Sequence, residues 1–170
     1  MPRRGFCGNN PGIPASHKTM KILLHSIVLV LTSASLALAG GEGWLTNWEA
    51  AKAKAKAENK PILINLTGSD WCTWCIKLEK EILSQKAFKD FAAENLVLMD
   101  ADFPKKKEQS AELKKQNAAL EKEYLAGGYP TVWLLDAEGK KLSTEDLGEL
   151  KVSPEAFIAK LKELIAKAKK

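Results

Sequence analysis

Residues 61–75 read PILINLTGSDWCTWC and join a predicted strand to a predicted helix. The first part, residues 61–67, is an almost continuous apolar run, typical of a strand buried on both faces of a parallel sheet. The turn residues 68–70 follow, and then Cys72 and Cys75, two thiols that can close or open a small disulfide. Free N–H groups at a helix N-terminus lower the pKa of a thiol. The stretch therefore predicts thiol–disulfide exchange at the carboxyl end of a strand.

The composition limits both the architecture and the class of partner. A chain of 170 residues with 45% hydrophobic composition can bury one ordinary core, so we expect one domain preceded by a leader. The formal net charge is +5, but four of the 26 basic residues and none of the 21 acidic residues precede Gly40. The remainder is almost neutral. This argues against nucleic acid as a partner, because phosphate binding needs clustered cations.

The cysteines and histidines divide at the same point. Both histidines and Cys7 precede Gly40, so the rest of the chain holds only Cys72 and Cys75. A structural zinc or iron–sulfur site needs about four such ligands, so we expect no metal site in one chain. Ser-His-Asp and Cys-His catalysis are excluded from the domain for lack of histidine. A Cu(I) carrier with two thiolate ligands is a disfavoured alternative.

The N-terminal region carries a secretory signal pattern at residues 20–39. Lys21 supplies the positive end, residues 22–38 the apolar stretch, and Ala37-Leu38-Ala39 a small-residue cleavage site. The alternative is a membrane anchor that is kept, but the histidine and hydroxyl groups within the apolar stretch disfavour it. We therefore expect cleavage after Ala39 and a periplasmic or secreted protein.

This pattern divides the chain into a leader at residues 1–39 and one domain at residues 40–170. In the leader, residues 1–19 are expected to be disordered or to lie upstream of Met20 as the true start. The apolar periods of the domain predict the element order αβαβαββα. The first expected helix runs from a Thr46–Glu49 capping box to Glu58, with Trp44 and Trp48 on its apolar face. Strands are expected at 62–66, 96–99 and 132–135, with a turn at 136–139 into a fourth strand near Lys140. The other expected helices are pieces at 76–92 broken near Ser84, a helix at 105–124 with Pro104 in its first turn, and a last helix capped by Ser153.

Three features together resemble the thioredoxin-like family over residues 44–170. Trp71-Cys72-x-x-Cys75 opens a helix after the first central strand, and Tyr124-x-x-x-Gly128-Tyr129-Pro130-Thr131 looks like the family's cis-proline segment. Two strands and a helix close the order. Within the family, the chain resembles secreted members related to the C-terminal domain of the bacterial transmembrane thiol:disulfide interchange protein, and the short disulfide-isomerase-like group. The resemblance implies an α/β, three-layer fold with a central mixed sheet of about four strands flanked by helices.

The resemblance also implies roles for the residues of these motifs. Cys72 would be the attacking thiol and Cys75 the resolving thiol, and their redox-active disulfide would be the only cofactor. Pro130 would be a cis-proline packed against the disulfide, and Tyr129 would offer backbone groups to an extended substrate. The alternative for Pro130 is an ordinary trans proline at the entry of a strand.

Four further residues are expected to serve the cysteine pair. We predict that Trp71 packs beneath the loop as a structural aromatic, whereas Trp74 is exposed and contacts substrate peptides. Asp70 and Thr131 are expected to support the site.

Two departures from the family pattern concern the second thiol. The family's buried aspartate, six residues before the first cysteine, is replaced by Leu66, and its partner lysine by Leu98. The proton of the second thiol would then pass to water, to Asp70 or to Glu79. Thr73-Trp74 replaces the Gly-Pro of thioredoxin between the cysteines. Since these loop residues influence the redox poise, the direction of electron flow stays open.

These observations predict a thiol:disulfide oxidoreductase that acts on protein thiol and disulfide substrates and on a redox partner protein. We expect a monomer that binds no nucleic acid and, once the leader is cleaved, no membrane. The alternative is a binding or chaperone-like module of the same fold, in which the two cysteines form a structural disulfide.

Overall fold

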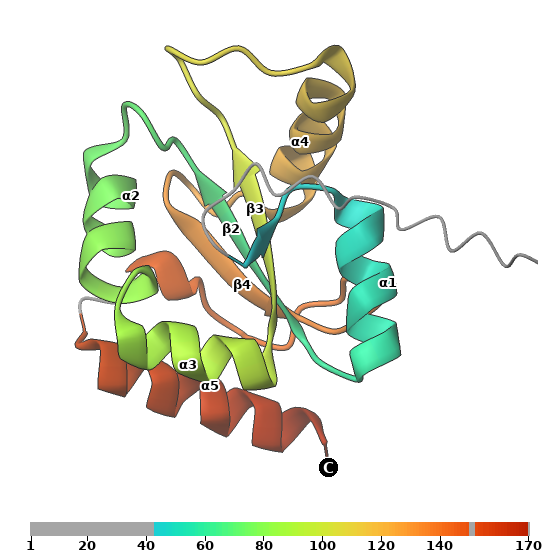
Figure 1. Ribbon diagram of the computed structural model, residues 1–170, viewed down its shortest axis with the longest axis vertical. Helices are drawn as coiled ribbons and strands as arrows, with labels where there is room; N and C mark the ends of the chain where they lie inside the picture. Colours follow the sequence, from blue (N-terminus) through green and yellow to red (C-terminus); the bar gives the residue numbers. More distant parts are fainter. Residues whose placement is uncertain (1–42, 150–151, 170) are drawn as a thin grey trace, which may run out of the picture. The chain divides into compact units, whose positions relative to one another are not determined.

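The computed structural model describes residues 43–149 and 152–169, so the predicted leader lies outside the described residues. Helices cover both faces of a central sheet (Figure 1). The elements in chain order are β1 (Trp44–Leu45), α1 (Trp48–Glu58), β2 (Ile62–Thr67), α2 (Thr73–Leu78), the π-helical turn η1 (Glu79–Leu83), α3 (Lys86–Asn95), β3 (Val97–Asp102), α4 (Ala111–Tyr124), β4 (Thr131–Leu135), the 3-10 turn η2 (Leu147–Glu149) and α5 (Pro154–Ala168).

The strand order in the sheet is β1-β3-β2-β4. Strand β3 runs parallel to β1 and β2, while β4 runs antiparallel to β2. Helices α1 and α4 cover one face of the sheet, and α2, α3 and α5 cover the other (Figure 1). This arrangement confirms the predicted α/β fold, with a mixed four-stranded sheet between helices.

Strand β2 lies inside the sheet, and all six of its residues are buried. Because successive side chains of a strand point to opposite faces, Ile62, Ile64 and Leu66 join the core beneath α1 and α4. Leu63 joins the core on the other face, where the rings of Phe88 and Phe157 lie 6.0 Å apart. The two covered faces account for the continuous apolar run in the sequence.

The prediction of a fourth strand near Lys140 is wrong. After β4 and its turn, the chain makes only an isolated bridge between Leu135 and Lys141. Ser143 Oγ accepts the N–H of Leu134 at 3.3 Å, so this side chain takes a position that a longer strand would need. The fourth strand is instead β1, which pairs with β3 and contains the tryptophan assigned to the first helix.

The helix predicted from residue 105 begins later, at α4, with Ser110 as its N-cap. Pro104 therefore lies in a loop and not in a first helical turn. The loop conformation is held from outside, because the carboxylate of Asp70 accepts the backbone N–H groups of Lys105 and Lys106 at 2.9 and 2.8 Å. The residue pattern at 105–124 cannot reveal this contact, because it involves a residue far away in the sequence.

The other helix boundaries are close to the predictions. Helix α1 begins one residue later than the capping box suggested, because Asn47 and not Thr46 is the N-cap, accepting the N–H of Ala50 at 2.8 Å. The predicted break occurs at Ser84, between η1 and α3, and Ser153 caps α5 as expected. Among the described residues, no helix combines the length and apolar character needed to cross a membrane.

Candidate redox site

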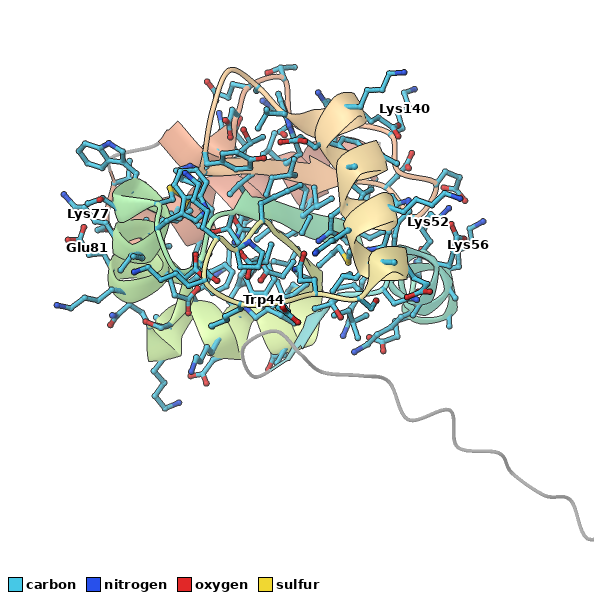
Figure 2. All side chains as sticks on the ribbon, turned by 90° about the horizontal axis from the view of Figure 1, so that it is seen from above. Trp44, Lys52, Lys56, Lys77, Glu81 and Lys140 are labelled. Atoms are coloured by element: carbon cyan, nitrogen blue, oxygen red, sulfur yellow. A yellow bond between two sulfur atoms is a disulfide. The ribbon has the colours of Figure 1, made fainter. Side chains whose placement is uncertain are left out.

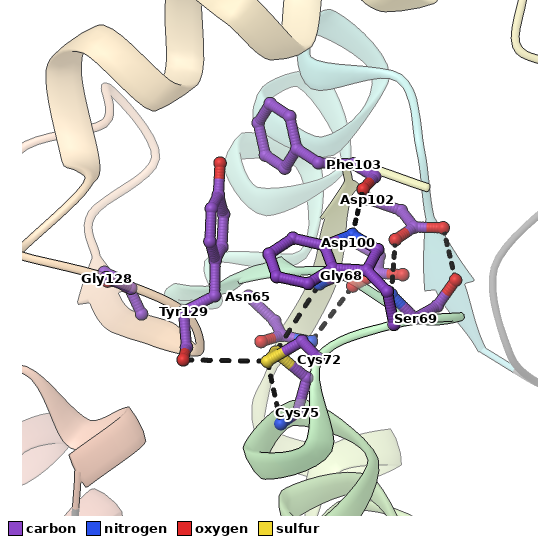
Figure 3. The surroundings of a disulfide bond; sticks show 12 residues. Asn65, Gly68, Ser69, Cys72, Cys75, Asp100, Asp102, Phe103, Gly128 and Tyr129 are labelled. Carbon is purple, nitrogen blue, oxygen red and sulfur yellow. Dashed lines mark hydrogen bonds between the residues drawn. A yellow bond between two sulfur atoms is a disulfide. The ribbon is translucent and has the colours of Figure 1, made fainter. Parts of the chain in front are cut away.

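The two cysteines lie immediately beyond the carboxyl end of β2, at the start of α2, and form a disulfide (Figure 3). Cys72 is the N-cap of α2, and its Sγ accepts the N–H of Cys75 at 3.2 Å. The Sγ of Cys75 accepts the N–H of Gly68 at 3.5 Å. Both N–H groups point at sulfur, so the backbone favours negative charge there when the disulfide is open.

The segment before β4, which contains Tyr129 and Pro130, lies beside the disulfide although it is 57 residues from Cys72 in the sequence. The Tyr129–Pro130 peptide bond is cis, as the resemblance implies. The carbonyl oxygen of Tyr129 lies 3.6 Å from Cys72 Sγ (Figure 3). Thr131 supports this segment, since its Oγ1 donates to the carbonyl of Gly128 at 2.7 Å and accepts the N–H of Ala126 at 3.2 Å.

Asp146 and Gly148 also hold the Pro130 segment, although neither residue belongs to a motif recognised in the sequence. Asp146 Oδ1 accepts the N–H groups of Val132 and Gly148 at 2.7 and 2.8 Å. A Cβ on Gly148 would lie 2.8 Å from the carbonyl oxygen of Pro130, so the turn packs directly against that segment. The only sequence signal was an Asp-x-Gly triplet in a loop, which is common in turns without any such contact.

Trp71 packs under the cysteine loop as predicted. It is half-buried, and its Nε1 donates to the carbonyl of Phe103 at 2.7 Å. Its ring meets that of Tyr129 edge-on, with centroids 5.8 Å apart, and Lys105 Nζ lies 3.8 Å from its centroid. Gly68 is required at this point, because a Cβ there would lie 2.5 Å from the indole ring.

Trp74 is exposed as predicted, with 58% of its surface accessible. It lines a groove of about 780 Å³ that continues past Tyr129 and Pro130 to Val152. Lys77 belongs to the same wall and lies 5.5 Å from the Trp74 ring centroid; it projects from the outer side of α2 (Figure 2). The groove thus combines apolar side chains with the charged Lys77 and Glu81, and Tyr129 brings it to the Cys72 side of the disulfide.

A second cavity of about 480 Å³ lies on the Cys75 side and is lined by several polar side chains, for which we call it the polar cavity. Its lining includes Asn65, Glu79 and Asp100 together with Cys75. Asn65 faces Asp100 across the β2–β3 pair and donates from Nδ2 to Asp100 Oδ1 at 3.0 Å (Figure 3). Burial of its carboxyl group, and secondarily the nearby charge of Asp102, raises the pKa of Asp100 to about 7, against the opposing effect of the Asn65 bond.

The assignment of Leu66 to the position of the family's buried aspartate is corrected by this geometry. Leu66 is fully buried on the opposite face of the sheet, and Asn65, one residue earlier, is the β2 side chain that shares a cavity with Cys75. Asp100, two residues beyond Leu98, is its partner on β3. A signal was present, because both polar residues directly follow three consecutive apolar residues of their strands. The direction in which each side chain points was not predictable without the register.

Of the two acids proposed for the second thiol, only Glu79 lines this cavity. Partial burial raises the pKa of Glu79 although the residue as a whole is exposed. Asp70 is instead bound to the loop after β3, where the backbone N–H of Lys105 holds the pKa of its carboxyl below the ordinary value. Asp70 therefore supports the site by fixing a loop.

The loops after β2 and β3 hold each other through reciprocal bonds. Asp70 in the first loop binds backbone N–H groups of the second. In return, Asp102 at the end of β3 accepts the backbone N–H of Ser69 at 2.9 Å and its Oγ–H at 2.7 Å (Figure 3). The Trp71 bond to Phe103 joins the same two loops. The loop that delivers Cys72 is thus tied to its neighbour along its length.

Comparisons with known proteins agree with this geometry. The chain is 41% identical over 99 residues to the disulfide bond reductase DsbH of Chlamydia pneumoniae, covering 56% of this chain and 60% of the relative. It is 27% identical over 99 residues to the thioredoxin-related protein DsbJ of the same organism, covering 58% of this chain and 28% of the relative. The aligned stretch therefore spans less than two thirds of either curated relative.

A solved structure shares the arrangement of elements. The DsbH oxidoreductase structure superposes with a TM-score of 0.64 and 37% identity, covering 68% of this chain and 79% of that chain. The family model described as thioredoxin-like matches residues 43–137, which include the cysteine pair and the Pro130 segment. The chain belongs to the thioredoxin-like family.

Proposed function

We propose that this protein is a thiol–disulfide oxidoreductase that reduces disulfides in protein substrates. In the reduced protein, the Cys72 thiolate attacks one sulfur of a substrate disulfide, and the other substrate sulfur leaves with the electron pair as a thiol. Cys75 then attacks Cys72, which releases the second substrate thiol and leaves the Cys72–Cys75 disulfide. The observation that carries the proposal is the position of Cys72 Sγ, which accepts a backbone N–H at the start of α2 beside the Tyr129 carbonyl.

The groove supports a protein substrate in an extended conformation. Tyr129 and Pro130 precede β4, whose pairing with β2 begins at Thr131, so their backbone lies outside that ladder. An extended peptide can pair with such backbone groups while its side chains enter the groove. Trp74 would supply a large contact at the groove wall.

The direction of electron flow is proposed from the relatives. DsbH, a relative at 41% identity, carries the name of a disulfide bond reductase. A reductase needs a redox partner protein that restores its dithiol, since one turnover leaves it oxidised. The signal pattern at residues 20–39 supports a periplasmic or secreted location, where substrates with disulfides occur.

Trapping the mixed disulfide tests the exchange reaction. In a Cys7→Ala background, which leaves only the site cysteines, Cys75→Ala should accumulate a covalent adduct with a disulfide-containing protein such as insulin. The matched Cys72→Ala variant should accumulate none. Absence of an adduct, together with failure of Cys72 to react with iodoacetamide at neutral pH, would refute the proposed function.

The reduction potential separates this proposal from a structural disulfide. Equilibration with glutathione buffers should give a value within the range of catalytic pairs, above roughly −300 mV. A more negative value would identify a stable cross-link in a binding module.

A further inference from the structure

We propose that Asp100 accepts the proton of the Cys75 thiol, through water in the polar cavity, when Cys75 resolves the mixed disulfide. The inference rests on the proposed function and adds a proton acceptor to its second step. Asp100 belongs to β3, so it is contributed by a strand that carries no part of the cysteine motif.

The cavity provides the connection between the two groups. Cys75 and Asp100 line the same space of about 480 Å³, which has room for several water molecules. Cys75 itself is only 3% exposed, so its proton has little direct access to bulk solvent. The substrate groove lies on the other side of the disulfide and does not include Cys75 in its lining. A proton leaving Cys75 therefore has the polar cavity as its route.

Asn65 holds Asp100 in place and leaves a second polar atom in the cavity. Its Nδ2 donates to Asp100 Oδ1, while its own Oδ1 is buried and accepts no hydrogen bond from any described residue. A buried carbonyl of this kind needs a donor, and a water molecule in the cavity can serve it. Asn65 thus both orients the carboxylate and offers an anchor for the water that carries the proton.

The surroundings of Asp100 bring the pKa of its carboxyl group close to neutral pH. Asp102 on the same strand faces it, and Glu79 and Lys80 face it from η1. Burial and the two acids raise the pKa of Asp100 to about 7, close to the value at which a carboxylate takes up and releases protons efficiently in neutral solution.

The neighbouring acids are less suited to this role. Asp102 already binds the N–H and Oγ–H of Ser69 through its two oxygens. Glu79 lines the cavity, but the residue is exposed to solvent, and Lys89 of α3 favours its charged form. Glu79 is therefore the competitor that an experiment must exclude.

The step balances in atoms and electrons. The Cys75 S–H bond breaks and its proton passes through water to the Asp100 carboxylate. The sulfur of Cys75 forms a bond to Cys72 Sγ, and the bond from Cys72 to the substrate sulfur breaks. The electron pair leaves with the substrate sulfur, which takes a proton from solvent. Asp100 returns its proton to the cavity water after the product has gone.

The test measures the two chemical steps separately. The reduced full-length Cys7→Ala protein is mixed with glutathione disulfide, quenched in acid at successive times and analysed by mass spectrometry for the glutathione adduct on Cys72. Asp100→Asn preserves the acceptor for Asn65 but cannot take the proton. It should slow the decay of the adduct at least about tenfold at pH 7. In a Cys75→Ser background it should leave the rate of adduct formation unchanged.

The pH profile distinguishes proton transfer from a structural effect. The decay rate of the wild-type adduct should rise with pH and level off above about pH 7, and Asp100→Asn should lose this inflection. Glu79→Gln and the distant Asp90→Asn should retain it. An unchanged profile in Asp100→Asn, or loss of the inflection in Glu79→Gln alone, would overturn the inference.

The wild-type profile also protects the test against a variant that does not fold. A wild-type decay rate that rises in proportion to hydroxide through about pH 8, without levelling, contradicts the inference by itself. If the reduced wild-type protein forms neither the adduct nor the Cys72–Cys75 disulfide, the proposed function fails instead, and the two failures are thereby distinguished.

Discussion

The two sides of the Cys72–Cys75 pair differ in origin and in chemistry. The groove beside Cys72 is built mainly from α2, η1 and the segment before β4, and it combines large apolar side chains with the charged Lys77 and Glu81. The cavity beside Cys75 is built largely from β2, β3 and η1, and it contains Asn65 and Asp100. The difference indicates a division of labour. In the two proposals above, one side contacts the substrate disulfide, and the other takes up the proton of the Cys75 thiol.

Removing the carboxylate of Asp100 should give the largest effect on stability. The pKa of Asp100 is raised to about 7, so the native state holds this proton more tightly than the unfolded chain, whose value is near 3.8. The contribution of Asp100 to the free energy of unfolding of the wild type is therefore fully present below about pH 4 and is lost as the pH rises through about 7. We expect the stability of Asp100→Asn relative to wild type to increase by about 2 to 4 kcal/mol over this window.

Urea unfolding of the two oxidised proteins at a series of pH values measures this difference. Asp90→Asn is the control, because its carboxylate is exposed on α3 and pairs with Lys86. A stability difference between Asp100→Asn and wild type that stays constant with pH would mean that Asp100 is not held protonated by its surroundings.

Gly68→Ala should disturb the boundary between the two sides. The new methyl group would overlap the indole of Trp71, which links the cysteine loop to Phe103 and Tyr129. We expect a loss of about 1 to 3 kcal/mol in unfolding free energy, as for other overpacked sites. Gly128→Ala is the matched control, since no atom lies within 4 Å of its Cβ position. Equal stability of the two variants would show that Trp71 can move without cost.

Gly148→Ala should damage the groove side alone. Its methyl group would press on the carbonyl of Pro130 and displace the segment that faces Cys72. We expect kcat/KM for reduction of insulin to fall about tenfold, equivalent to about 1.4 kcal/mol. The pKa of Asp100, followed by carboxyl NMR, should stay unchanged. A shift in that pKa would show that the two sides are not independent.

Trp74→Ala should give the smallest effect and the most selective one. Its side chain is 58% exposed, so stability should change by no more than about 0.5 kcal/mol. We expect kcat/KM for insulin to fall about threefold to tenfold because an aromatic contact is lost. The rate with glutathione disulfide, which is too small to fill the groove, should be unaffected. Equal losses for both substrates would argue against a contact with protein substrates.

The sequence predicted the groove side better than the cavity side. Cys72, Cys75 and Pro130 belong to short local motifs, and the exposure of Trp74 followed from its place in one of them. The partners on the cavity side come from two strands. Asn65 and not Leu66 faces Cys75, and since adjacent residues of a strand point to opposite faces, an offset of one residue changes the conclusion completely.

The start of α4 and strand β1 were also predicted wrongly because they depend on contacts between residues distant in the sequence. The late start of α4 depends on Asp70, whose carboxylate accepts a hydrogen bond from the backbone N–H of Lys105. The two residues are 35 positions apart in the sequence. The short β1 forms because its two residues can pair with the edge of β3. Two residues are too few to show the alternation that predicts a strand. By contrast, Ser153 and Pro154 mark the start of α5 through local capping, and that boundary was correct.

The reciprocal bonds of Asp70 and Asp102 make the loops after β2 and β3 one cooperative unit. Neither loop can open locally without breaking bonds that hold the other, so their amide protons should exchange with solvent together. Such coupling keeps the Cys72 loop from opening on its own, so the position of the sulfur atoms relative to the Tyr129 carbonyl is set by both loops together.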